Sequence, residues 1–134
     1  MKRSLCAGLL ILFMALPGLG LTEGDDTIQL AKTIYTLGRD ESYQTKLMIG
    51  TVVMNRVESP WYPDTVREVL NQPHQFPRGT YFDEESLKAA REIMMGQRAL
   101  PQNITAYIDM DENSANRISQ SVILSGKYGF YQGE

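Results

Sequence analysis

The spacing of apolar residues predicts two helices near the start of the folded part of the chain. Along residues 26–38 apolar residues recur every three or four positions, as on one face of a helix. Asp26, with Gln29 three residues later, resembles a capping box and is the expected start of this helix. Residues 47–57 are apolar almost all round, which is typical of the buried central helix of a small domain. We expect this second helix to begin at Ser42.

Two further helices and a small strand element are expected downstream. Thr65 and Glu68 have the spacing of a cap for a short helix. A fourth helix is expected to open at Asp83 or Ser86 and to be closed by Gly96. Beyond it, the runs ITAYIDM, SVIL and YGFY are short, β-branched and aromatic, and turn residues bound them. The pattern predicts an α+β domain that is mostly helical, with a small β element near the C-terminus.

The N-terminal segment has the pattern of a signal peptide, which we expect to span residues 1–21. Lys2 and Arg3 form a basic region, residues 5–16 are apolar, and small residues near Gly20 offer a cleavage site. This pattern predicts export, with secretion or residence in the cell envelope. The alternative is an uncleaved anchor, because the apolar run is at the short limit for a membrane span.

Composition narrows the functions open to the remaining domain, residues 22–134. Without Lys2 and Arg3 the chain has 11 basic and 16 acidic side chains, a formal charge of −5. Such a balance argues against nucleic acid as a partner, because phosphate contacts need clustered cations. The only cysteine, Cys6, lies in the signal segment, and His74 is the only histidine. We therefore expect no disulfide, no metal site and no cofactor, and a monomeric domain.

Several motifs, taken together in order, identify a family. They are TIY followed by Arg39 and Glu41, then VVMNRVESPWYPDTVREV, QPHQF, KAAREIMMG and the final GKYGFY. Across residues 30–131 this succession resembles the cell wall hydrolase family typified by the bacterial spore cortex-lytic enzymes. The resemblance implies a single lysozyme-like or lytic-transglycosylase-like domain whose partner is the glycan strand of peptidoglycan.

One departure from the family pattern affects the expected chemistry directly. In the family, the tyrosine of the first helix is followed two residues later by a glutamate that serves as general acid. Here the tyrosine is Tyr35, and the residue two positions on is Leu37. Cleaving a glycosidic bond requires protonation of a poor leaving group, which leucine cannot perform. Loss of general acid catalysis typically lowers a rate by about a hundred- to ten-thousand-fold.

Glu41 is the first candidate for the catalytic residue that remains, and Asp40 is the second. If the first helix continued, the side chains at 37 and 41 would share a face, with Cβ atoms roughly 5–6 Å apart. Gly38 and Asp40 instead suggest that the helix ends before Glu41. The alternative for Glu41 is a solvated or cap-like carboxylate near the second helix. Arg39 is expected to hold a carboxylate such as Glu41.

The resemblance also suggests which residues surround the cleft and bind substrate. They are Tyr35, Arg39, Gln75, Phe76 and Tyr128, the last of which stands where the family usually has a histidine. Tyr35 also fits a core position by its helical spacing. Phe76 also fits a hydrophobic plug.

Three hypotheses follow for the function. The first is a secreted peptidoglycan-cleaving hydrolase or lytic transglycosylase that acts between muramic acid and glucosamine, with Glu41 as the surviving acid. The second is a catalytically impaired pseudoenzyme that binds peptidoglycan without turnover. The third is an exported structural or regulatory protein with no affinity for glycan.

Overall fold

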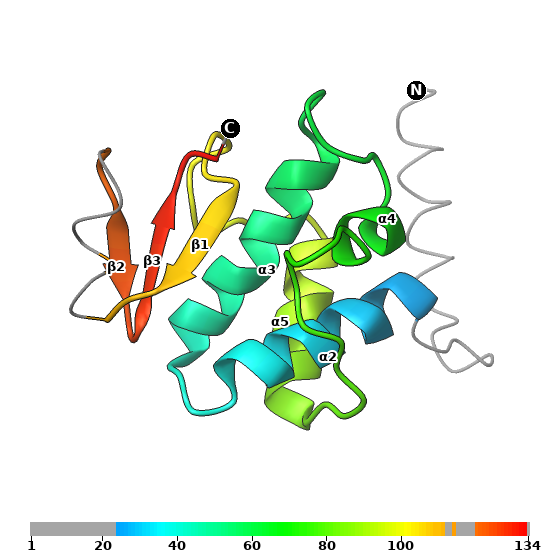
Figure 1. Ribbon diagram of the computed structural model, residues 1–134. Helices are drawn as coiled ribbons and strands as arrows, with labels where there is room; N and C mark the ends of the chain where they lie inside the picture. Colours follow the sequence, from blue (N-terminus) through cyan, green and yellow to red (C-terminus); the bar gives the residue numbers. More distant parts are fainter. Residues whose placement is uncertain (1–23, 112–113, 115–119, 134) are drawn as a thin grey trace, which may run out of the picture.

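The computed structural model describes residues 24–111, 114 and 120–133. In this part of the chain the helices come first and the strands last. The elements are α2 (Asp25–Gly38), α3 (Tyr43–Val57), α4 (Val66–Leu70), α5 (Glu84–Met94), β1 (Ala106–Asp109), β2 (Ile123–Ser125) and β3 (Tyr128–Tyr131). Figure 1 shows the sheet on one side of α3 and the other helices on the opposite side. The predicted mostly helical α+β class is confirmed.

Helix α3 is the centre of the core, as its all-round apolar sequence predicts. Ile49, Val52 and Val53 are at most 1% exposed. The helix contacts α2, α4 and α5 as well as strand β1. Gly50 permits the close approach of α5, because a Cβ at this position would lie 2.9 Å from a side-chain carbon of Ile93. A helix packed on all sides must be apolar on all sides, which explains its sequence.

The sheet is antiparallel, with strand order β1-β3-β2. Strand β3 is central, and its residues Tyr128 and Phe130 belong to the hydrophobic core. The short β2–β3 connection pairs Ser125 with Tyr128 and leaves Gly126 and Lys127 at the turn. Gly126 has φ +59, a left-handed conformation that favours glycine. This turn forms one edge of the candidate site.

The helix starts confirm most of the local predictions and correct one. Ser42, Thr65 and Asp83 each accept a hydrogen bond from the backbone N–H three residues on, as N-caps do. The prediction that Asp26 opens the first helix was wrong, because α2 begins one residue earlier with Gly24 as its N-cap. Both aspartates of the first turn lie inside the helix, where they interact favourably with its N-terminal dipole.

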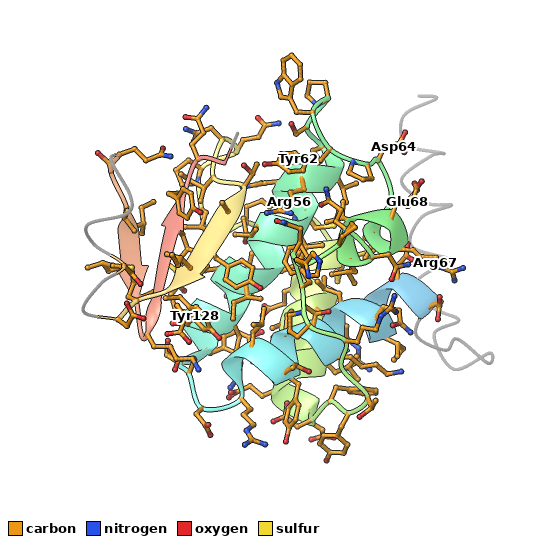
Figure 2. All side chains as sticks on the ribbon, in the orientation of Figure 1. Arg56, Tyr62, Asp64, Arg67, Glu68 and Tyr128 are labelled. Atoms are coloured by element: carbon orange, nitrogen blue, oxygen red, sulfur yellow. The ribbon has the colours of Figure 1, made fainter. Side chains whose placement is uncertain are left out.

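Two polar residues at the end of α3 hold the chain that leads into the sheet. Asn55 Nδ2 donates to the carbonyls of Pro101 and Ile104, both at 2.8 Å. Arg56 Nε donates to the carbonyl of Thr105 at 2.6 Å, and its guanidinium lies 4.8 Å from the Tyr62 ring centroid. Burial lowers the pKa of Arg56. Figure 2 shows Arg56 and Tyr62 together near the C-terminal end of α3. None of the helices in the described ranges is long and apolar enough to cross a membrane.

Candidate substrate groove

A groove of about 490 Å³ opens at the C-terminal end of α2. Three segments that are distant in sequence form it: the end of α2 with the turn that follows, the loop before α5, and the β2–β3 turn. The lining residues are Tyr35, Thr36, Leu37, Arg39, Asp40, Glu41, Arg78, Gly79, Thr80, Tyr81 and Lys127. The groove therefore contains both Leu37 and Glu41.

Leu37 presents a hydrocarbon side chain to the groove at the position where the resemblance leads us to expect an acid. The residue is half-buried and packs against the hydrophobic core. Its backbone carbonyl, one of the last in α2, accepts a hydrogen bond from the Tyr128 hydroxyl at 2.6 Å. This bond satisfies a carbonyl that has no partner within the helix. The backbone at position 37 is thus fixed to the sheet, and the leucine side chain has no acidic proton to donate.

Glu41 lies beyond the end of the helix, as Gly38 and Asp40 suggested. Helix α2 ends at Gly38, whose carbonyl accepts the Glu41 N–H at 2.9 Å in a tight turn. The i, i+4 arrangement with Leu37 on one continuous helix is therefore absent. The Glu41 side chain instead reaches the β2–β3 turn, where its Oε1 accepts the backbone N–H of Lys127 at 3.1 Å.

The glycine of that turn is required for this contact. A Cβ at Gly126 would overlap Oε1 of Glu41. Within the described part of the chain, Oε2 of Glu41 has no hydrogen-bond partner, whereas Oε1 is held by Lys127. Glu41 is thus a positioned carboxylate in the groove wall, half-buried, with one oxygen available to a ligand.

A buried lysine that the sequence did not single out supports the turn carrying Glu41. Lys46 is only 3% exposed, and its Nζ donates to the Glu41 backbone carbonyl at 3.2 Å. The same ammonium forms an ion pair with Glu85 at the start of α5. A buried ammonium needs such partners, so Lys46 fixes the 39–42 turn against two helices. The only sequence signal for this residue is its place immediately before the apolar run of the helix, residues 47–57.

Arg39 does not hold Glu41, so that prediction was wrong. Its Nε lies 3.7 Å from the carboxylate of Asp40, and both side chains are well exposed. Exposed ion pairs of this length contribute little stability. The physical reason is the end of α2 at Gly38, which turns Arg39 and Asp40 outward while Glu41 turns towards the sheet. Arg39 remains at the groove as an exposed cation.

Aromatic rings form one wall of the groove. Tyr35 is half-buried and lines the groove, and its ring meets that of Tyr81 edge-to-face at 4.9 Å between centroids. Tyr81 is 60% exposed. Sequence reasoning missed Tyr81, because it lies in a loop among proline and glycine, where an aromatic residue has no periodic pattern to mark it. An exposed ring fixed by a second ring is suited to stacking on a sugar.

Three of the residues expected around the cleft do not line this groove. Phe76 is only 8% exposed and packs on Tyr107, with ring centroids 5.6 Å apart. Tyr128 is 3% exposed, and its ring meets that of Tyr107 edge-to-face with centroids 5.8 Å apart. Gln75 is exposed, and its backbone carbonyl accepts a hydrogen bond from the Tyr107 hydroxyl at 2.8 Å. None of the three lines the groove, and Phe76 has the placement of a hydrophobic plug.

Replacing Tyr128 with Phe is expected to lower the free energy of unfolding by about 1–3 kcal/mol, because it leaves the Leu37 carbonyl without its donor. Urea unfolding at neutral pH measures the change. Tyr81→Phe is the matched control, since that hydroxyl lies on an exposed ring and its loss should change stability by less than about 0.5 kcal/mol. Equal effects of the two variants would contradict the assigned contact.

The same variant has an expected signature at high pH. Burial, with smaller contributions from Asp109, Tyr107 and Glu41, raises the pKa of Tyr128 to about 12. An unfolded tyrosine ionises near pH 10, whereas Tyr128 in the folded protein stays neutral up to about pH 12. The free energy of unfolding is therefore unaffected by this group below pH 10 and falls progressively from pH 10 to 12. The wild-type protein should therefore lose more stability over that window than Tyr128→Phe. Parallel curves for the two proteins would show that Tyr128 does not titrate as a buried phenol.

The fold is that of a lysozyme-like α+β domain. It matches the catalytic domain of the Bacillus cereus SleB protein with a TM-score of 0.70 at 21% identity, over 84% of this chain and 94% of the other. A second match is the catalytic domain of the germination-specific lytic transglycosylase SleB of Bacillus anthracis, with a TM-score of 0.68 at 22% identity. That match covers 85% of this chain and 98% of the other.

The chain belongs to the Cell Wall Hydrolase family, whose model matches residues 40–131. Among curated proteins it is similar to the spore cortex-lytic enzyme of Halalkalibacterium halodurans, 32% identical over 80 residues, which is 54% of this chain and 24% of the other. The corresponding enzyme of Oceanobacillus iheyensis is 30% identical over 63 residues, 45% of this chain and 23% of the other. This chain thus spans about a quarter of the length of these relatives. The family match begins at Asp40, beyond Leu37, so it does not include position 37.

Proposed function

We propose that this domain binds the glycan strands of peptidoglycan in the groove beside α2 and cleaves them, with Glu41 as the proton donor. Membership of the Cell Wall Hydrolase family supports the substrate class and a place of action at the cell envelope. The observation that carries the catalytic part is the position of Glu41. Its carboxylate is fixed by Lys127 in the groove wall, close in sequence to Leu37, and its second oxygen has no hydrogen-bond partner among the described residues.

A single carboxyl group is sufficient for the cleavage step. In its protonated form it gives its proton to the glycosidic oxygen as the bond to the muramic sugar breaks. The resulting carboxylate then accepts a proton from the incoming nucleophile, which returns the group to its starting state. If the nucleophile is the sugar's own 6-hydroxyl, the product has a 1,6-anhydro end. If it is water, the product has a reducing end.

The rest of the groove has groups that suit a peptidoglycan strand. Tyr35 and Tyr81 offer aromatic surface to sugar rings. Arg39, Arg78 and Lys127 place three cations around the groove of a protein that is acidic as a whole. Peptidoglycan carries carboxylates on its peptide stems, and cations at the groove rim would favour their approach.

A second candidate function is binding of peptidoglycan without cleavage. Two observations favour it: Leu37 cannot donate a proton, and the hydrogen bond to Lys127 gives Glu41 a sufficient structural role as an anchor of the β2–β3 turn. In this case the groove would retain its affinity for glycan strands and lack turnover.

Incubation of the domain with purified peptidoglycan distinguishes these functions. We expect soluble muropeptides, identified by mass spectrometry, and the mass of their ends separates 1,6-anhydro products from reducing ones. Sedimentation of the protein with insoluble peptidoglycan, without soluble products, would support binding alone. If no soluble muropeptides form and the protein does not sediment with peptidoglycan, both functions are overturned. That result would support the third hypothesis, an exported structural or regulatory protein with no affinity for glycan.

A further inference from the structure

A second groove, remote from the first, lies at the opposite end of α3. It has a volume of about 340 Å³ and is formed by the turn after α3, the segment before β1 and the end of the chain after β3. Tyr62 lines it, and Figure 2 shows this residue near the C-terminal end of α3, whereas Tyr128 lies towards the other end. Helix α3 has 15 residues, so the two grooves are separated by roughly 20 Å.

The rim of this groove carries the most exposed aromatic ring of the described residues. Trp61 is 85% exposed, so its indole is almost entirely in water. Single exposed apolar side chains are common, and the exposure alone indicates nothing. The setting is more specific, because Pro60 precedes the tryptophan. The backbone N–H of Trp61 donates to the Ser59 hydroxyl at 3.2 Å. The ring is therefore presented by an ordered turn beside a concave surface.

The floor of the groove is held in place by contacts with the core. The Tyr62 ring lies over the buried Arg56 guanidinium, and its hydroxyl donates to Thr105 Oγ1 at 3.3 Å. Thr105 Oγ1 in turn accepts the Gly133 N–H at 3.0 Å. Gly133 permits this closeness, because a Cβ there would lie 2.7 Å from the Tyr62 hydroxyl. A fixed floor means that a ligand would not have to order it.

The polar side chains of the groove are amides and hydroxyls, and its one charged residue is already paired. Gln102, Asn103 and Gln132 supply side-chain amides, with Asn103 Nδ2 3.4 Å from the Gln132 amide oxygen. Glu58 is the only ionisable carboxylate or cation of the lining, and Arg98 donates to it at 3.0 Å. A surface of amides, hydroxyls and aromatic rings, whose one carboxylate is paired with Arg98, is complementary to an uncharged ligand that has hydroxyl and acetamido groups.

We infer that this Trp61 groove is a second carbohydrate-binding site, which takes an uncharged stretch of N-acetylated glycan. The indole stacks on a sugar face, and the amides of Gln102 and Asn103 exchange hydrogen bonds with hydroxyl and acetamido groups. The inference rests on the proposed function only for the identity of the natural polymer. A strand held at this groove as well as beside α2 would dissociate more slowly than one held at either alone.

Trp61 is the only tryptophan of the chain, so tryptophan emission, excited at a wavelength that tyrosine does not absorb, reports on this groove alone. Titration of the full protein with the uncharged N-acetylglucosamine tetramer should give a saturable change in emission, shifted to shorter wavelength as the indole leaves water. Asn103→Ala keeps the fluorophore and should weaken binding about three- to tenfold. Tyr81→Ala, in the other groove, should leave the titration unchanged.

The outcomes separate this inference from the proposed function. No emission change at millimolar tetramer, or equal affinity for the wild type and Asn103→Ala, would overturn the Trp61 site whether or not peptidoglycan is cleaved. An emission change that depends on protein concentration without sugar would overturn it in favour of self-association. If the protein releases no muropeptides but the tetramer still changes the Trp61 emission, the result counts against cleavage and supports the Trp61 site.

Discussion

Leu37→Glu is expected to raise the rate of muropeptide release, by about a hundred- to ten-thousand-fold if the wild type has no general acid and by less if Glu41 already serves as one. The substitution places a carboxyl group on the groove wall, at the position where the resemblance leads us to expect a general acid. The backbone there is already fixed by the hydrogen bond from Tyr128, so the new side chain starts from a defined point. Since position 37 is half-buried against the core, we also expect a loss of stability of about 1–2 kcal/mol. Mass spectrometry of the soluble products measures the rate.

Leu37→Gln is the matched control for this prediction. It has nearly the same shape and polarity as the glutamate but cannot act as a general acid, so it should stay at the wild-type rate. Circular dichroism and urea unfolding establish that both variants are folded. A folded Leu37→Glu protein with the same rate as Leu37→Gln would show that the groove no longer places a glycosidic bond near position 37.

Glu41→Gln is expected to lower the wild-type rate by about a hundred- to ten-thousand-fold, because the proposed proton donor is removed. The amide oxygen of glutamine can still accept the Lys127 N–H, so the β2–β3 turn and the stability of the protein should be retained. This isosteric change separates the catalytic role from the structural one. Rates are again measured from the soluble muropeptides.

Asp40→Asn is the matched control for Glu41, since it removes a neighbouring carboxylate that is well exposed and also lines the groove. It should leave the rate within about twofold of wild type. If Glu41→Gln is as active as the wild type, Glu41 is an anchor of the turn and another group supplies the proton. If the wild type is inactive and only Leu37→Glu releases fragments, binding without cleavage is the function.

Local signals in the sequence were sufficient for most of the secondary structure. The caps at Ser42, Thr65 and Asp83 join a side chain to a backbone N–H three residues away, so the sequence contains both partners within one turn. The burial of α3 was also predicted from its sequence, because a helix that packs on every side has no polar face. The first helix was misplaced by one residue at its start, since Gly24 as an N-cap needs no side-chain bond.

The candidate site was only partly predictable. Glu41 and Tyr35 were selected from their order in the family motif, and both line the groove. Gln75, Phe76 and Tyr128 were selected in the same way but gather around Tyr107, outside the groove. Order along the chain does not say which side of a loop or strand faces the cavity. Tyr81 and Lys46 had no local pattern, and their roles depend on partners in α2 and α5.

By itself, the sequence determined the helices and the strands, the centre of the core, and the fact that position 37 has no proton to give. These depend on residue type and on spacing within a few residues. The tertiary structure decided where the remaining carboxylate points. Helix α2 ends at Gly38, and the glycine of the β2–β3 turn lets Lys127 approach, so Glu41 bonds to a residue far along the chain. Contacts across such a separation form only when the whole core packs, which no local pattern encodes.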